Sequence, residues 1–176
     1  MSYHDMYSQD DVFGKIPSRA NSETLSRILI STDDINRQLS NGTDPIELSI
    51  LKWERVKDAY KWTKIEAWRW LYYGDIFEKI RSDTCPLCII ALKDFENEFG
   101  NQKHIKDKCT KCKLAQIEFC PDIDSLFSNI TYLLGYVPPI KNGTPKLNLA
   151  NLNDDEQYNL LGEYIDEMIE RLKSLE

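Results

Sequence analysis

Glycine and proline are scarce in this chain, and it contains no long apolar run. Seven residues of each type occur among 176, too few for a collagen-like or linker-dominated protein. No stretch of about 18 apolar residues is present, which argues against a membrane-spanning helix. The first eleven residues are polar and lack the apolar region of a secretory signal. We therefore expect a globular protein of the reducing cytoplasm, where thiols stay free.

The motifs of common catalytic sites are also missing. The sequence has no Gly-x-Gly-x-x-Gly, no phosphate loop and no His-Glu-x-x-His. Only two histidines occur, and neither is near a candidate nucleophile in the sequence, so a catalytic triad is not favoured. Acidic residues are plentiful, but no pair stands out from solvated helix faces. We expect that the protein is not an enzyme.

Cysteine provides the clearest pattern in the sequence. Two pairs, Cys85-Pro-Leu-Cys88 and Cys109-Thr-Lys-Cys112, are separated by twenty residues. Each Cys-x-x-Cys pair forms a tight turn that directs two sulfurs to one point. Four thiolates complete a tetrahedral shell and leave no open position for a substrate. The spacing therefore predicts a structural Zn²⁺ site with these four cysteines as ligands.

Other interpretations of the cysteines remain open. Cys120 or His104 could replace one of the four ligands, although a free cysteine is commonly a small buried residue. An iron–sulfur cluster uses the same ligand type. A redox-active Cys85–Cys88 pair is a third possibility, but such pairs normally accompany a βαβ pattern, which this sequence does not show.

A basic segment surrounds the second cysteine pair. Its lysines, with Asp107 as the single acidic residue among them, are Lys103, Lys106, Lys108, Lys111 and Lys113. They could offset the net charge of about −2 that four thiolates leave on Zn²⁺, or they could bind phosphate. The sequence does not decide between these two roles.

The spacing of apolar residues predicts an all-α fold. The clearest helix start combines Asp44 as N-cap, Pro45 at the first helical position and Glu47 at the third. The helix that follows has one apolar face, formed by Ile46, Ile50, Trp53, Val56 and Tyr60. We expect a small helical bundle with a zinc-stabilised loop that joins two Cys-x-x-Cys knuckles.

Similar signals predict the other helices. Short helices are expected after Ser22 and after Thr32. A longer one should run from Pro86 to just before Gly100, and another should open at Cys120-Pro121-Asp122 and end at Gly135. The chain then divides into an N-terminal arm (1–20), a helical domain with the zinc site (21–135), a loop (136–152) and a C-terminal acidic amphipathic helix (153–176).

The C-terminal helix is expected to begin at Asn153 and Glu156, which form a capping box. Its apolar stripe comprises Tyr158, Leu161, Ile165, Met168, Leu172 and Leu175. The stripe could dock on the body of the protein or pair with a second copy through residues 158–175. Residues 151–176 carry eight acidic side chains against Arg171 and Lys173, so this end of the chain could also imitate nucleic acid.

Aromatic residues concentrate in residues 62–73, which include Trp68 and Trp70. These tryptophans fall on different faces of a helix, so one lone helix cannot bury both on one side. The segment is therefore either a central part of the core or a surface that stacks on bases or anchors a partner.

The order of Trp53, the two Cys-x-x-Cys pairs and a trailing Cys120 resembles a group of small cysteine-rich proteins of bacteriophage and microbial genomes. The resemblance covers about residues 46–121. It implies a zinc-binding protein and is consistent with a viral origin and a location in the host cytoplasm. It implies no particular activity.

Together these patterns favour a non-enzymatic zinc protein that binds a macromolecule, most simply another protein. One alternative is a nucleic-acid-binding zinc protein that uses the lysines of residues 103–113 with Trp68 or Trp70. A second alternative is an acidic decoy that inhibits a nucleic-acid-binding protein. Phosphate contacts would make binding fall steeply with ionic strength, which separates the first alternative from protein binding.

Overall fold

The computed structural model describes residues 27–60, 77–80, 84–100, 109–120, 122–134 and 146–176. Within these ranges the α-helices are α3 (Thr32–Ser40), α4 (Pro45–Tyr60), α6 (Phe77–Ile80), α7 (Pro86–Phe99), α9 (Leu126–Leu133) and α10 (Asp154–Lys173). Two short 3₁₀ helices, η3 (Leu114–Gln116) and η5 (Leu149–Asn151), accompany them, and no strand occurs in the same ranges. The expected all-α class is confirmed. The predicted N-terminal arm and the aromatic segment 62–73 lie outside the described residues.

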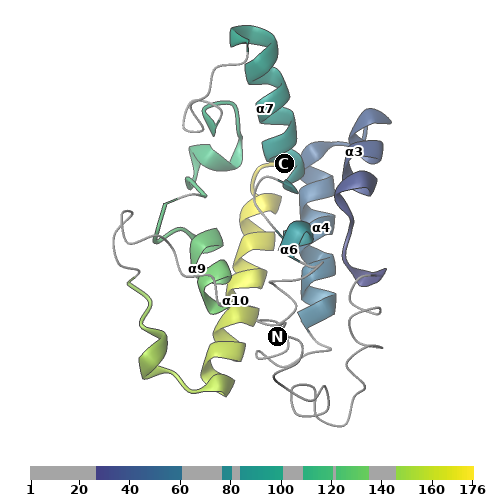
Figure 1. Ribbon diagram of the computed structural model, residues 1–176. Coiled ribbons are helices and arrows are strands. Elements are labelled where there is room, and N and C mark those ends of the chain that lie inside the picture. The colour runs from purple at the N-terminus through teal and green to yellow at the C-terminus, as the bar shows by residue number, and fades with distance from the viewer. Residues whose placement is uncertain (1–26, 61–76, 81–83, 101–108, 121, 135–145) are drawn as a thin grey trace, which may run out of the picture.

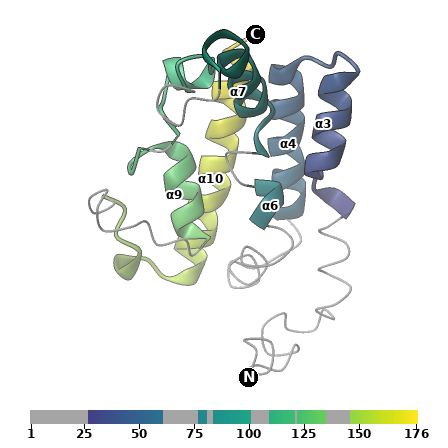
Figure 2. The same cartoon turned by 45° about the horizontal axis from the view of Figure 1, so that its top comes forward.

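Two helices, α4 and α10, form the centre of the bundle (Figure 1). The C-terminal helix α10 packs against both α4 and α9, while α4 also packs against α7. In Figure 2 α9, α10, α4 and α3 stand side by side in that order, and α3 also contacts α7. The predicted C-terminal helix is thus part of the main core. The aromatic ring of Trp53 on α4 meets that of Phe127 on α9 edge-on, with the ring centres 6.4 Å apart.

The start of α4 is the one that the sequence predicts. The carboxylate oxygen Oδ1 of Asp44 accepts hydrogen bonds from the backbone N–H groups of Ile46 at 2.7 Å and Glu47 at 3.1 Å. These bonds satisfy donors that have no partner inside the helix.

More of α4 is buried than its predicted apolar face. The buried residues include the expected Ile46, Ile50, Trp53 and Val56. They also include Leu48, Ser49, Lys52 and Ala59. Neighbours on several sides bury a helix on more than one face, and α4 packs against both α10 and α7. The prediction of one apolar face was therefore too narrow.

The predicted capping box of α10 is present. The side chain of Asn153 accepts from the backbone N–H of Glu156 at 2.9 Å, and the Glu156 carboxylate accepts from the N–H of Asn153 at 2.8 Å. Within the predicted stripe, Leu161, Ile165, Met168 and Leu172 are buried. The chain itself covers this stripe with α4 and α9, as the docking alternative expects.

The helix after the second cysteine pair begins later than predicted. It starts at Leu126, with Ser125 as its N-cap, and not at the Cys120-Pro121-Asp122 sequence. The hydroxyl groups of Ser125 and Ser128 both donate to the backbone carbonyl of Cys120, at 2.7 and 3.2 Å. These bonds hold the residues before α9 in turns, so the helix cannot extend back to Cys120.

The C-terminal end of α7 agrees with the prediction. Gly100 follows the helix with φ of 71°, a left-handed conformation that favours glycine. Leu87, Ala91 and Phe95 are buried, whereas Phe99 is 48% exposed. Among the residues that the structure describes, no helix is long and apolar enough to cross a membrane.

Candidate metal centre

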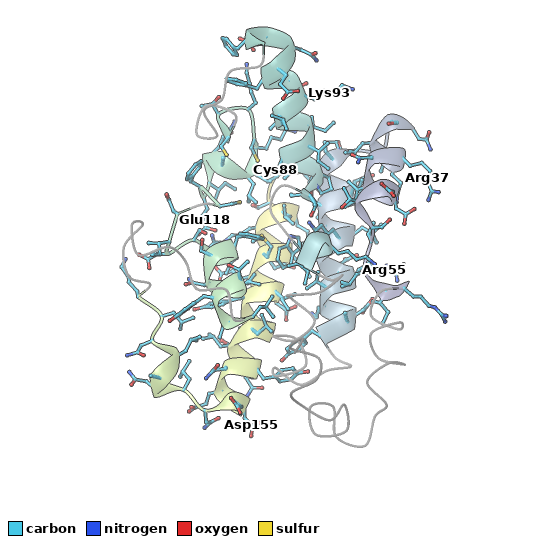
Figure 3. All side chains as sticks on the ribbon, viewed as in Figure 1. Arg37, Arg55, Cys88, Lys93, Glu118 and Asp155 are labelled. Carbon is cyan, nitrogen blue, oxygen red and sulfur yellow. The ribbon has the colours of Figure 1, made fainter. Side chains whose placement is uncertain are left out.

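Three separate segments bring the five cysteines toward one end of the bundle. Cys85 is the N-cap residue of α7, and Cys88 lies in the first turn of that helix. Cys109 and Cys112 form a turn before η3, closed by a hydrogen bond from the Cys112 N–H to the Cys109 carbonyl at 3.0 Å. Cys120 precedes α9. In Figure 3 Cys88 lies at the base of α7, beside the segment that carries the second pair.

The thiol of Cys88 lies between two other sulfurs. Its side chain forms hydrogen bonds with those of Cys112 and Cys85. Its single S–H proton can be donated to one of these sulfurs at a time, and the bonds together with burial raise the pKa of Cys88 well above the usual value of a thiol. The same bonds lower the pKa of Cys85 and of Cys112, because a thiolate accepts them better than a thiol does. The two predicted knuckles therefore meet through Cys88 and Cys112.

Cys109 and Cys120 lie at the edge of this group. Burial raises the pKa of Cys109, and the nearby Cys112 adds to the effect. Burial also raises the pKa of Cys120, and Cys85 and Cys112 are the next contributors. Cys120 is thus near Cys85, Cys109 and Cys112. At this position the sequence favoured a buried cysteine apart from the metal site. All five cysteines are free of disulfide bonds.

The sulfurs do not form a single coordination shell as they stand. Within the described ranges, no group of three or more His, Cys, Asp or Glu side chains is arranged so that it could hold a metal ion. The contacts described above are pairwise, running from Cys85 through Cys88 to Cys112. The fold therefore brings the predicted cysteine ligands near one another. The zinc-stabilised loop remains a prediction. His104 lies outside the described residues.

Helix α4 contributes two polar groups to this region that sequence reasoning missed. The Ser49 hydroxyl lies 3.7 Å from the Cys85 sulfur. The ammonium group of Lys52, only 2% exposed, donates to the Thr84 hydroxyl at 3.1 Å. Its positive charge contributes to the lowered pKa of Cys85, after the larger effect of Cys88. In the sequence Lys52 stands beside Trp53, and this position alone does not reveal that the lysine is buried.

Two ion pairs attach the segment 109–120 to the helices. Lys111 pairs with Glu98 near the end of α7, and its Nζ lies 5.7 Å from the ring centre of Phe99. Glu118 pairs with Arg171 of α10 at 2.8 Å. Cys112 and Leu114 are buried in the core between these pairs. The knuckle is therefore anchored to both α7 and α10.

Only part of the predicted binding surface lies in the described residues. Lys103, Lys106, Lys108, Trp68 and Trp70 fall outside them. Lys111 is engaged by Glu98 and Phe99, while Lys113 is exposed. One predicted role of these lysines is to balance the negative charge of the thiolates. Lys52 is a different candidate for that role.

The acidic face of α10 is partly neutralised within the chain. Asp166 pairs with Lys57 of α4, Glu167 with Arg171 and Glu170 with Lys173. Asp154, Asp155 and Glu163 are exposed. Fewer carboxylates are thus left to imitate nucleic acid than the sequence suggests.

The comparisons with models of protein families, with curated proteins and with solved structures return no significant match.

Proposed function

We propose that this chain is a non-enzymatic, zinc-stabilised helical protein that binds another protein. The observation that carries the zinc part is the contact of Cys88 with both Cys85 and Cys112, which joins two segments distant in the chain. Thiolates at this spacing are the ligands that structural Zn²⁺ prefers. Cys85, Cys88, Cys109 and Cys112 are the proposed ligands, with Cys120 nearby as a substitute.

Zinc in this position would replace hydrogen bonds between thiols with bonds from thiolates to the metal. Its binding free energy would add to the folding free energy of the segment 109–120. Because the core residue Leu114 lies on that segment, the metal would also stabilise the packing of the segment on the bundle. This is a structural use of the metal and involves no substrate.

The proposed partner surface lies around the anchored knuckle. Among the residues that the structure describes, the exposed large hydrophobic side chains are Phe99, at 48%, and Ile117, at 53%. They come from the end of α7 and from the residue after η3. Exposed large apolar side chains favour contact with a protein. The engagement of Lys111 by Glu98 reduces the charge available for phosphate, which favours a protein over a nucleic acid.

The test captures partners on the immobilised full-length chain and on the variant Phe99→Ser/Ile117→Ser, with Lys93→Ser on the exposed side of α7 as control. We expect a partner that the wild type and the control retain and the double variant loses. Binding should also persist as salt is raised. Retention of nucleic acid that salt releases steeply would favour the nucleic-acid alternative, and loss of binding on neutralising Asp154, Asp155 and Glu163 would favour the acidic decoy.

A further inference from the structure

A fully buried lysine lies beside the cysteine cluster. Lys52 is 2% exposed, and its ammonium group donates to the Thr84 hydroxyl, one residue before Cys85. An ammonium group away from water is costly unless hydrogen bonds and negative charge compensate it. Lysine is therefore rarely fully buried, and its presence here calls for a physical role.

The position of Lys52 on α4 directs it to one end of the cluster. Ser49 lies one turn earlier on the same side of the helix, and its hydroxyl is 3.7 Å from the Cys85 sulfur. The Ser49 hydroxyl also donates to the backbone carbonyl of Pro45 at 2.7 Å, which fixes its place. Ser49 and Lys52 of α4 thus contact the adjacent residues Cys85 and Thr84 as a pair.

We propose that Lys52 is a positioning residue for the metal centre, whose buried ammonium offsets the negative charge of the thiolates from the α4 side. This inference rests on the proposed zinc site. Four thiolates on Zn²⁺ carry a net charge of about −2, and an ammonium group held beside Thr84 and Cys85 lowers the cost of burying that charge. Partners that hydrogen-bond or balance metal ligands commonly tune the affinity of the site.

Lys52 supplies this counter-charge from a fixed position in the core. Lys111, by contrast, is held by Glu98 and Phe99, and Lys113 is exposed to solvent. A buried charge is screened by salt much less than an exposed one. The effect of Lys52 on the metal should therefore persist at high ionic strength.

The test measures Zn²⁺ affinity of the full chain by competition with a chromophoric chelator, at low and high salt. Lys52→Met should bind zinc about 10- to 100-fold more weakly than the wild type, and Lys52→Arg should recover part of the loss. The matched control is Lys57→Met, which removes a partly exposed lysine of the same helix that pairs with Asp166 and should leave the affinity unchanged. Thr84→Val removes the hydroxyl that receives the ammonium and should weaken zinc binding in the same direction.

Thermal melting with and without zinc separates a charge effect from a packing effect. If Lys52 acts on the metal centre through its charge, Lys52→Met should reduce the rise in Tm that zinc produces, whatever it does to the Tm of the metal-free protein. Equal zinc affinity of wild type and Lys52→Met would overturn the inference while the zinc site stands. A parallel fall of metal-free stability and zinc affinity in both the Met and the Arg variants would also overturn it. Absence of zinc binding by the wild type would instead overturn the proposed function.

Discussion

The hydroxyl groups of Tyr60 and Tyr158 each donate a hydrogen bond to the backbone carbonyl of the other residue. The Tyr60 Oη lies 2.9 Å from the Tyr158 carbonyl oxygen, and the Tyr158 Oη lies 2.7 Å from that of Tyr60. The two rings stack with their centres 4.2 Å apart. Since Tyr60 ends α4 and its carbonyl has no partner within the helix, this pair caps α4 while joining it to α10.

Removing either hydroxyl should weaken this junction. Tyr60→Phe and Tyr158→Phe should each lower the free energy of unfolding by about 1 kcal/mol, because each leaves a carbonyl without its donor. The measurement is urea denaturation followed by circular dichroism. Tyr164→Phe is the control, since Tyr164 is on the same helix and makes no hydrogen bond to the described residues through its hydroxyl. A loss equal to that of the control would contradict the role of the pair.

The same junction predicts a loss of stability at alkaline pH. Burial and the adjacent Tyr158 raise the pKa of Tyr60 from 10.0 to about 12. A group whose pKa is higher in the folded state stabilises the fold fully below its unfolded pKa, and that contribution disappears as pH rises through the folded value. Between pH 10 and about pH 12 the urea midpoint of the wild type should therefore fall more steeply than that of Tyr60→Phe. Parallel pH profiles would refute this account.

Gly162 has little room for a side chain because of Tyr60. A Cβ atom at Gly162 would lie 2.7 Å from the Tyr60 Oη and 2.9 Å from its Cζ. Alanine normally stabilises a helix interior by about 1 kcal/mol relative to glycine, but overpacking costs about 1–3 kcal/mol. Because hydrogen bonding and stacking hold the Tyr60 ring, we expect Gly162→Ala to be destabilising by about 1 kcal/mol.

A double-mutant cycle isolates this contact. In the Tyr60→Ala background the clash is gone, so Gly162→Ala should become stabilising through helix propensity. Glu163→Ala, at the next and exposed position of α10, serves as control in both backgrounds. An unchanged sign of the Gly162→Ala effect would show that Tyr60 is not the cause.

Local signals in the sequence were enough to predict several helix ends. Asp44 and the Asn153–Glu156 capping box act within a few residues of themselves, so their role can be read without the fold. The start of α9 could not be predicted in this way, because it depends on the hydroxyl groups of Ser125 and Ser128 bonding back to Cys120. The Cys120-Pro121-Asp122 sequence is a local signal that predicts an earlier helix start, and these bonds override it.

The candidate site was predicted in part for the same reason. The spacing of Cys85, Cys88, Cys109 and Cys112 is a local pattern, and the structure brings thiols of both pairs into contact. The burial of Lys52 depends on which helices pack around α4, and a single lysine in an apolar stretch does not reveal that. The ion pair of Glu118 with Arg171 joins residues more than fifty positions apart, and neither side chain carries a local signal for the other.

The central position of Cys88 predicts its effect on the metal and on stability. Cys88→Ser should lose stoichiometric zinc. A ligand present at about 1,000 times its Kd contributes about 4 kcal/mol, and each kcal/mol corresponds to about 2–4 °C for a chain of this size. The Tm should thus fall by about 8–16 °C in the presence of zinc. Cys120→Ser, which leaves the four proposed ligands in place, should retain the metal.

The most direct test of the account is elemental analysis of the full-length chain, freshly purified under anaerobic conditions. The account predicts about one equivalent of zinc per chain, lost together with the folded signal of the segment 109–120 when a strong chelator is added. Protein that is folded and free of zinc and of any other metal, with a Tm that does not change when zinc is supplied, would contradict it.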